Sequence, residues 1–125
     1  MTAPLVLRDA IHALLWSRHP IVTVGRLSDL LGLHERTLRK RFQKEQLPNP
    51  QWLIGWSRLL VAAWMLSDQS RTVDDVSRVL DYSTPSSFRG TFKRYTGTTA
   101  SEARVADPIG VVALAMRRAY GVESN

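Results

Sequence analysis

The residues of this sequence best suited to binding chemistry are cations in one short stretch, LHERTLRKRFQK, at positions 33–44. Leu38 and Phe42 are four residues apart, so on a helix both lie on one face. Of the five cations in the stretch, we assign four to the remaining surface of the helix: Arg36, Arg39, Lys40 and Lys44. Ammonium and guanidinium groups bind phosphates, and arginine also matches the edge of guanine. The stretch predicts a helix that packs on a small core and faces a polyanion, although charge alone equally fits a solvated surface helix.

The chain as a whole is also basic. Its 125 residues include 17 Lys and Arg against 11 Asp and Glu, which gives a net charge of +6. Hydrophobic residues make up 44% of it, enough to support a core and to argue against disorder. This charge balance favours an acidic partner, with nucleic acid first and an anionic membrane surface second.

Several classes of protein are disfavoured by what the sequence lacks. There is no cysteine, which excludes disulfides, thiol nucleophiles and cysteine-containing zinc sites. There is no long apolar run, and the apolar N-terminal stretch is interrupted by Arg8, Asp9 and His12, which argues against a membrane span or a signal peptide. The histidines are scattered singly, no carboxylate pair lies in an obvious cleft, and no phosphate-binding glycine loop is present. We therefore expect a cytoplasmic protein that is not an enzyme and has no cofactor or metal.

The first half predicts an N-terminal helix that ends near His19 and Pro20, and then a helix-turn-helix over about residues 23–46. Thr23 is a suitable N-cap, and Gly32 suits a chain reversal with positive φ. The basic stretch supplies the second helix of this pair. The first helix of the pair has a predicted apolar stripe: Leu27, Leu30 and Leu31.

A longer helix is predicted over about residues 50–67, with Asn49 as its cap and Pro50 in its first position. Its apolar residues keep a helical period and predict a buried stripe: Trp52, Trp56, Leu59, Leu60, Ala63 and Trp64. The tryptophans are open to a second interpretation, as stacking platforms for single-stranded nucleic acid. Their helical spacing favours the core.

A second helix-turn-helix is predicted over about residues 72–97. Thr72 and Asp75 form a near capping box, with Asp in place of the usual Glu. The predicted stripe of its first helix is Val73, Val76, Val79 and Leu80. Asp81 and Tyr82 form the corner, and the second helix starts at Thr84-Pro85 and ends at Gly97.

The two helix pairs repeat each other. Equivalent positions lie 49 residues apart before the turn and 50 apart after it: Thr23 and Thr72, Val24 and Val73, Leu38 and Phe88, Phe42 and Phe92. A shared cap, stripe and i, i+4 pair favours a duplicated helix-turn-helix, although two unrelated amphipathic helices can also match this loosely.

This arrangement resembles the DNA-binding domain of the AraC/XylS family of transcription regulators over about residues 5–104. The first signature is similar to LSDLLGLHERTLRKRF at 27–42, and the second to SSFRGTFKRYTG at 86–97. Between them, Arg58-Leu59 followed by Ala62 and Leu66 resembles the linker-helix signature. The resemblance implies an all-α fold of two helix-turn-helix subdomains joined by a long helix, with roughly seven helices plus a C-terminal one.

The sequence departs from the family pattern at four places. Asp81-Tyr82 replaces Gly-Phe at the second corner, Gln46 replaces a glycine, and Ala100 replaces a proline. Gly90 stands where some relatives have a base-reading side chain. These departures put the DNA readout of the second half in doubt more than its fold.

The resemblance implies that the second helix of each pair enters the major groove of promoter DNA, in two successive grooves about 34 Å apart. The implied base-reading residues are Arg36, Arg39 and Lys40 in the first half and Ser86, Ser87 and Arg89 in the second, with Pro85 and Gly90 beside them. Phosphate contacts are expected at Thr23, Lys44, Thr72, Lys93 and Arg94. RNA polymerase is a further possible partner.

The remaining residues, 105–125, predict an extension with a helix over 109–120, which either packs back on the domain or contacts a partner. Larger family members have an effector-binding domain, for which we expect no room in this chain. Three alternatives stay open: a nucleic-acid-binding protein that is not a regulator, a protein-interaction adaptor with the same repeat, and a basic amphipathic membrane binder.

Overall fold

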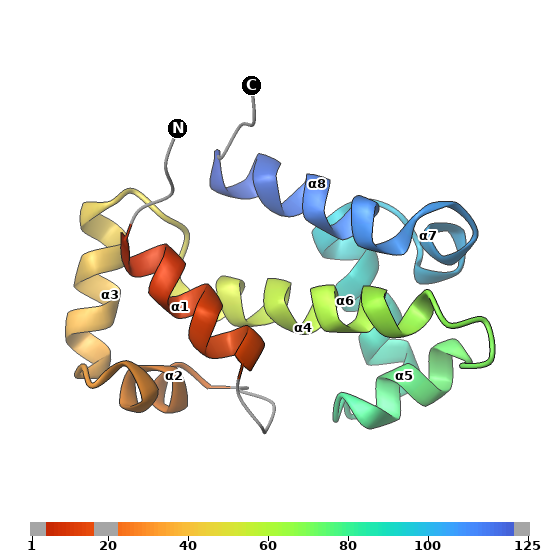
Figure 1. The fold of residues 1–125 in the computed structure, drawn as a ribbon, viewed down its shortest axis with the longest axis horizontal. Coiled ribbons are helices and arrows are strands. Elements are labelled where there is room, and N and C mark those ends of the chain that lie inside the picture. Colours follow the sequence, from red (N-terminus) through yellow and green to blue (C-terminus); the bar gives the residue numbers. More distant parts are fainter. Residues whose placement is uncertain (1–4, 17–22, 122–125) are drawn as a thin grey trace. The chain divides into compact units, whose positions relative to one another are not determined.

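The computed structural model describes residues 5–16 and 23–121 of the chain (Figure 1). These residues form eight α-helices and no strand, so the predicted all-α fold and helix count are confirmed for this part of the chain. The chain divides into two compact units, one made of residues 1–57 with 119–125 and the other of residues 58–118. The helices are α1 (Leu5–Trp16), α2 (Val24–Leu31), α3 (Glu35–Lys44), α4 (Pro50–Leu66), α5 (Val73–Val79), α6 (Pro85–Thr96), α7 (Ala100–Ala106) and α8 (Pro108–Tyr120).

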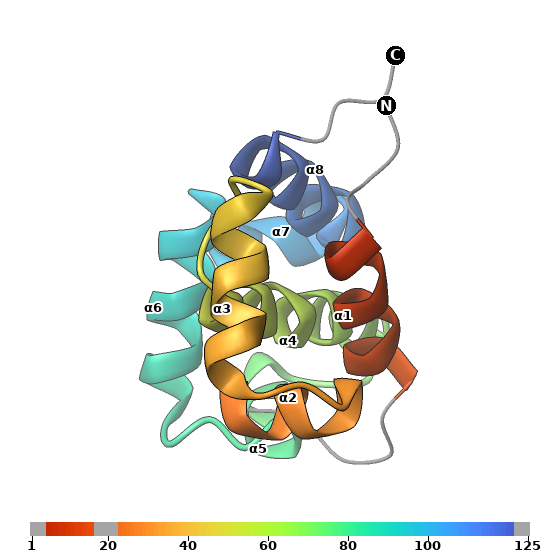
Figure 2. The same ribbon diagram turned by 90° about the vertical axis from the view of Figure 1, so that its left-hand side faces the viewer.

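The first unit contains α1, α2, α3 and the start of α4. Thr23 caps α2 as predicted, because its Oγ1 accepts a hydrogen bond from the Arg26 amide at 3.1 Å. Gly32 then has a φ of 67°, the left-handed conformation that lets the chain reverse into α3 (Figure 2). Side chains from three helices form the core of this unit: Leu27, Leu38, Phe42, Leu53 and Ile54.

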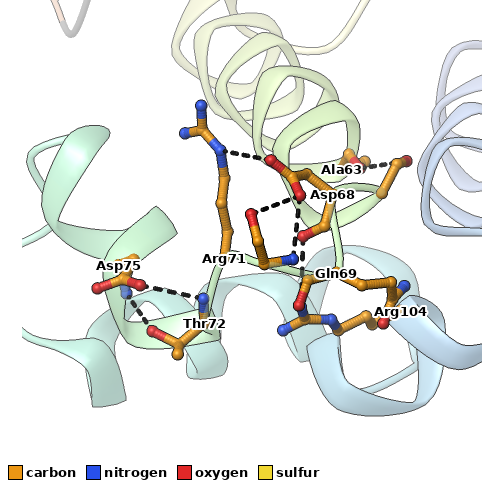
Figure 3. Close-up of polar contacts among 9 residues, drawn as sticks. Ala63, Asp68, Gln69, Arg71, Thr72, Asp75 and Arg104 are labelled. Atoms are coloured by element: carbon orange, nitrogen blue, oxygen red, sulfur yellow. Dashed lines mark hydrogen bonds and ion pairs between the residues drawn. The ribbon is translucent and has the colours of Figure 1, made fainter.

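The second unit contains the rest of α4 together with α5, α6, α7 and most of α8. The predicted capping box of α5 is present: the Asp75 amide donates to Thr72 Oγ1 at 3.0 Å, and the Thr72 amide donates to Asp75 Oδ2 at 3.1 Å (Figure 3). Thr84 caps α6 through the Ser87 amide, also at 3.0 Å. The largest buried side chains of this unit are Leu59, Leu66, Val76, Phe88, Phe92 and Val112.

Two arginines fix the loops of the second unit. The Arg58 Nη2 donates to the Leu80 carbonyl at 2.6 Å, and its guanidinium lies 4.1 Å from the centre of the Tyr82 ring. The Arg104 Nη2 of α7 donates to the Gln69 carbonyl at 2.9 Å and approaches the Asp68 carbonyl at 3.3 Å (Figure 3). The C-terminal end of α5 is therefore held by a side chain of α4, and the loop that precedes α5 by a side chain of α7.

The predicted apolar stripes are wrong at four residues. Trp52 and Trp64 of α4 are 41% and 66% exposed, whereas Trp56 between them is buried. Leu30 and Val79, near the ends of α2 and α5, are 45% and 59% exposed. Helical spacing shows which apolar residues share a side of a helix. It does not show how much of that side is covered by neighbouring helices, and here the cover is incomplete.

The first and the last helix differ in how far their predicted ends can be compared with the structure. The predicted end of the first helix, near His19 and Pro20, lies outside the described residues. The C-terminal helix predicted from residue 109 begins at Pro108, which takes its first position because a proline there loses no helical hydrogen bond.

Candidate nucleic-acid interface

Helix α3 has a buried apolar side and an exposed cationic side. Leu38 and Phe42 are 0% and 1% exposed, as the i, i+4 spacing predicts. The four predicted cations are all exposed: Arg36, Arg39, Lys40 and Lys44. Arg41 is also exposed, and the sequence reasoning did not select it, although its place between two selected cations was a visible signal.

The cations of α3 differ in how they are held. The Arg39 Nη2 lies 2.6 Å from Glu35 Oε1, one helical turn earlier, and both side chains are about half exposed. Arg36 and Lys40 have no hydrogen bond or ion pair with any other described residue. Helix α3 therefore presents one arginine that is held by its own helix and two cationic side chains that are free to follow a ligand.

Helix α6 presents a smaller and more polar set of groups. Ser86, Ser87, Arg89 and Gly90 are exposed along its first turns, with Pro85 at the first position. Its one cation in these turns, Arg89, has its Nη2 at 2.8 Å from Asp74 Oδ1 of α5. No atom lies within 4 Å of a Cβ built on Gly90, so the missing side chain leaves open space and not a tight contact.

The five predicted phosphate-binding residues lie in different surroundings. Thr23 and Thr72 are exposed, and each hydroxyl already caps a helix. The start of α5 also carries Asp74 and Asp75, and two carboxylates there oppose a phosphate. Thr23 is therefore the stronger of the two candidates, because the first turn of α2 has no acidic residue.

The three cationic phosphate candidates lie near helix ends. The Lys93 Nζ donates to the Gly97 carbonyl at 2.9 Å, and Arg94 lies 5.8 Å from the centre of the Tyr95 ring. Lys44, at the end of α3, lines a pocket of about 310 Å³ together with Val6, Asp9, Arg41 and Glu45. Its acidic and basic side chains balance each other, so the pocket itself has no clear preference for an anion.

Two of the three acidic residues of the second pair, Asp74 and Asp75, form ion pairs with Arg89 and Arg78. Hydrogen bonds from the Thr72 amide and hydroxyl, with the ion pair to Arg78, hold the pKa of Asp75 below its ordinary value of 3.8. Burial raises the pKa of Tyr82, next to Arg58, above 10.0. Asp75 is therefore committed to Thr72 and Arg78, and the carboxylate of α5 that contacts α6 is that of Asp74.

Comparison with known proteins identifies the family. A family model described as a helix-turn-helix domain matches residues 27–106, which include most of both helix pairs and α4. The chain belongs to the AraC-type helix-turn-helix family. The family expected from the sequence signatures is thereby confirmed.

The relatives of this AraC-type chain are named as regulators. It is 36% identical over 74 residues to the HTH-type transcriptional regulator VqsM of Pseudomonas aeruginosa, in a match that covers 59% of this chain and 22% of VqsM. It is 39% identical over 77 residues to the virulence regulon transcriptional activator VirF of Shigella flexneri, covering 59% of this chain and 29% of VirF. The chain thus spans less than a third of the length of these relatives. No solved structure gives a significant match.

Among the described residues, none of the helices is both long enough and apolar enough to cross a membrane. Over the same residues, no group of three or more His, Cys, Asp or Glu side chains could hold a metal ion.

Proposed function

We propose that this AraC-type domain binds double-stranded DNA sequence-specifically and regulates transcription in the bacterial cytoplasm, on the nucleoid. The observation that carries the proposal is the family match over both helix pairs. In each pair the second helix exposes cations and buries two apolar side chains: Leu38 and Phe42 in α3, Phe88 and Phe92 in α6. The names of VqsM and VirF, both transcriptional regulators, support the regulatory role.

In the proposed complex, α3 is the main base reader. Arg36 and Lys40 can reach base edges in the major groove, since neither has a partner to leave among the described residues. Each arginine that forms two parallel hydrogen bonds with guanine discriminates against the wrong base by about 1–3 kcal/mol. Lys44, at the end of the helix, is assigned to the phosphate backbone, together with Thr23 at the start of α2.

Helix α6 is assigned a smaller share of base reading. Ser86, Ser87 and Arg89 are its candidate donors, and of these only Arg89 can make a two-bond contact with guanine. Lys93 and Arg94 lie near the other end of α6 and are assigned to phosphates, which fix register without reading sequence. Two helices reading successive major grooves would bind two sequence blocks about one helical turn apart.

The test is selection of bound duplexes from a random DNA pool at about 150 mM salt, where purely electrostatic binding is weak. Two enriched blocks, about one turn apart, are the expected result. A single block would assign base reading to α3 alone and overturn the role of α6. Binding that shows no enriched sequence and disappears as salt rises would overturn sequence-specific regulation and leave a basic domain that binds nucleic acid without reading it.

A promoter-reporter assay then separates regulation from binding. The selected sequence, placed upstream of a reporter gene, should change its expression when the chain is present, and RNA polymerase recruitment can be followed on the same template. Selective binding without any change in expression would favour a nucleic-acid-binding protein that is not a regulator.

A further inference from the structure

Asp74 and Arg89 form the one ion pair of the described residues that joins the two helices of a helix-turn-helix pair. The other three ion pairs join residues three or four positions apart. Asp74 lies in the first turn of α5, and Arg89 lies in the proposed base-reading part of α6. The pair therefore connects a supporting helix with a reading side chain.

The surroundings of Asp74 favour a lasting contact with Arg89. Its Oδ1 is buried and has no aligned hydrogen bond, so the Arg89 guanidinium at 2.8 Å is the charge that compensates it. The neighbouring carboxylate, Asp75, is committed to the Thr72 amide and to Arg78 and does not compete for Arg89. The Asp74 side chain is about half exposed, like that of Arg89, and Arg89 is the cation that covers its Oδ1 in the folded chain.

The same contact leaves most of Arg89 available. A guanidinium has five N–H donors, and in the described structure only the Nη2 group approaches Asp74. About half of the Arg89 side chain is exposed, and its neighbour Gly90 has no side chain that could compete for the same space. An arginine fixed on one side and open on the other is suited to contact guanine with little loss of side-chain freedom.

We propose that Asp74 is a positioning residue for base recognition, which holds Arg89 of α6 in the orientation that reads a guanine. The inference deepens the proposed function and rests on it. It assigns to α5 a part in specificity through Arg89, without contact between Asp74 and DNA. It also makes a distinctive prediction about sign: loss of the negative charge strengthens attraction to any duplex but weakens the preference for one base.

The experiment compares five forms of the 125-residue chain on the selected duplex, on its single-base variants and on random duplex: wild type, Asp74→Asn, Arg89→Ala, the double variant, and Asp81→Asn as control. Asp81 is exposed on the turn of the same pair and has no described ion pair, and asparagine tolerates its φ of 61°. Asp81→Asn therefore changes the net charge by the same amount without touching Arg89. Thermal unfolding of each form verifies that it is folded.

Arg89→Ala should remove the preference for guanine at one position, and Asp74→Asn should lower that same preference by at least about fivefold. Asp74→Asn should leave the other positions unchanged and bind random duplex as well as wild type or better. In the Arg89→Ala background it should have no effect on base preference, and Asp81→Asn should leave every preference unchanged.

Three results would overturn the inference. If Asp74→Asn strengthens binding to selected and random duplexes equally, as Asp81→Asn should, Asp74 only adds negative charge. If Arg89→Ala removes the guanine preference and Asp74→Asn does not lower it, the positioning role fails while the proposed function stands. If the wild-type chain prefers no sequence at all, the proposed function and this inference fail together.

Discussion

The two helix-turn-helix pairs of this chain share a backbone plan but carry different charges. Each pair begins with a threonine cap, turns through a residue with positive φ and buries two side chains of its second helix. Residues 23–46 contain six basic and three acidic residues, whereas residues 72–97 contain four basic and three acidic. The shared backbone plan therefore tolerates a change in surface charge, because exposed side chains contribute little to the core.

The turns of the two pairs differ in what makes them possible. Gly32 adopts its φ of 67° without a steric penalty, whereas Asp81 has a φ of 61° with a Cβ. The second turn has additional support, because Arg58 donates to the Leu80 carbonyl and lies over the Tyr82 ring. Side chains outside the turn thus compensate for a residue that fits the turn less well.

The largest effects are expected from removing a proposed base-reading residue of the first pair or a proposed phosphate-binding residue of the second pair. Arg36→Ala should lower the preference for one base in the selected sequence by about 1–3 kcal/mol, because a two-bond guanine contact is lost. Lys93→Ala should weaken binding to all duplexes alike and reduce the slope of log affinity against log salt by about 1. Both are measured as salt titrations on selected and random duplexes.

Lys93 also donates to the Gly97 carbonyl, so its variant needs a stability control. Thermal unfolding of Lys93→Ala without DNA gives the loss of stability that comes from the missing contact at the helix end alone. Equal effects of Arg36→Ala on selected and random duplexes would contradict the assignment of α3 as the specific reader.

A medium effect is expected from exchanging the turn residues. Asp81→Gly should raise the free energy of unfolding by up to about 1 kcal/mol, because glycine removes the penalty of a positive φ. Gly32→Asp should lower it, by a larger amount than the first gain, since the first turn has no described contact like that of Arg58. Chemical denaturation measures both. A destabilising Asp81→Gly would mean that the Asp81 side chain stabilises the second turn in a way its contacts do not indicate.

The smallest effect is expected from acid, and it should affect the second pair. Because the folded-state pKa of Asp75 is depressed below 3.8, its contribution to stability is present above that value and is lost as the pH falls through the folded-state pKa. Thermal unfolding between about pH 5 and pH 2 should therefore show a steeper fall for wild type than for Asp75→Asn. Asp29→Asn, in the corresponding helix of the first pair and without a capping box, is the matched control. Parallel curves for wild type and Asp75→Asn would count against this role.

Much of the backbone of this chain was predictable from local sequence. Thr23 and Thr84 start helices, and Gly32 and Gly97 end them, because a cap or a positive φ depends on a few neighbouring residues. The burial of Leu38 and Phe42 also followed from spacing, since one face of a short helix must cover the core. The predicted base-reading and phosphate-binding roles are still predictions, because they depend on a DNA partner.

Other features depended on residues that are far apart in the sequence. Spacing predicted equal burial for Trp56 and Trp64, yet Trp56 is buried and Trp64 is 66% exposed, because burial depends on which helix face a neighbour covers. The Glu35–Arg39 pair was readable from its i, i+4 spacing, whereas Asp74 and Arg89 are 15 residues apart on different helices. Their contact exists only because the turn at Asp81 brings the start of α5 beside α6. The sequence by itself thus determined where several of the helices begin or end and which of them are basic, because those properties are local. The tertiary structure decided which apolar side chains are covered and which arginine is held, because both depend on contacts between distant segments.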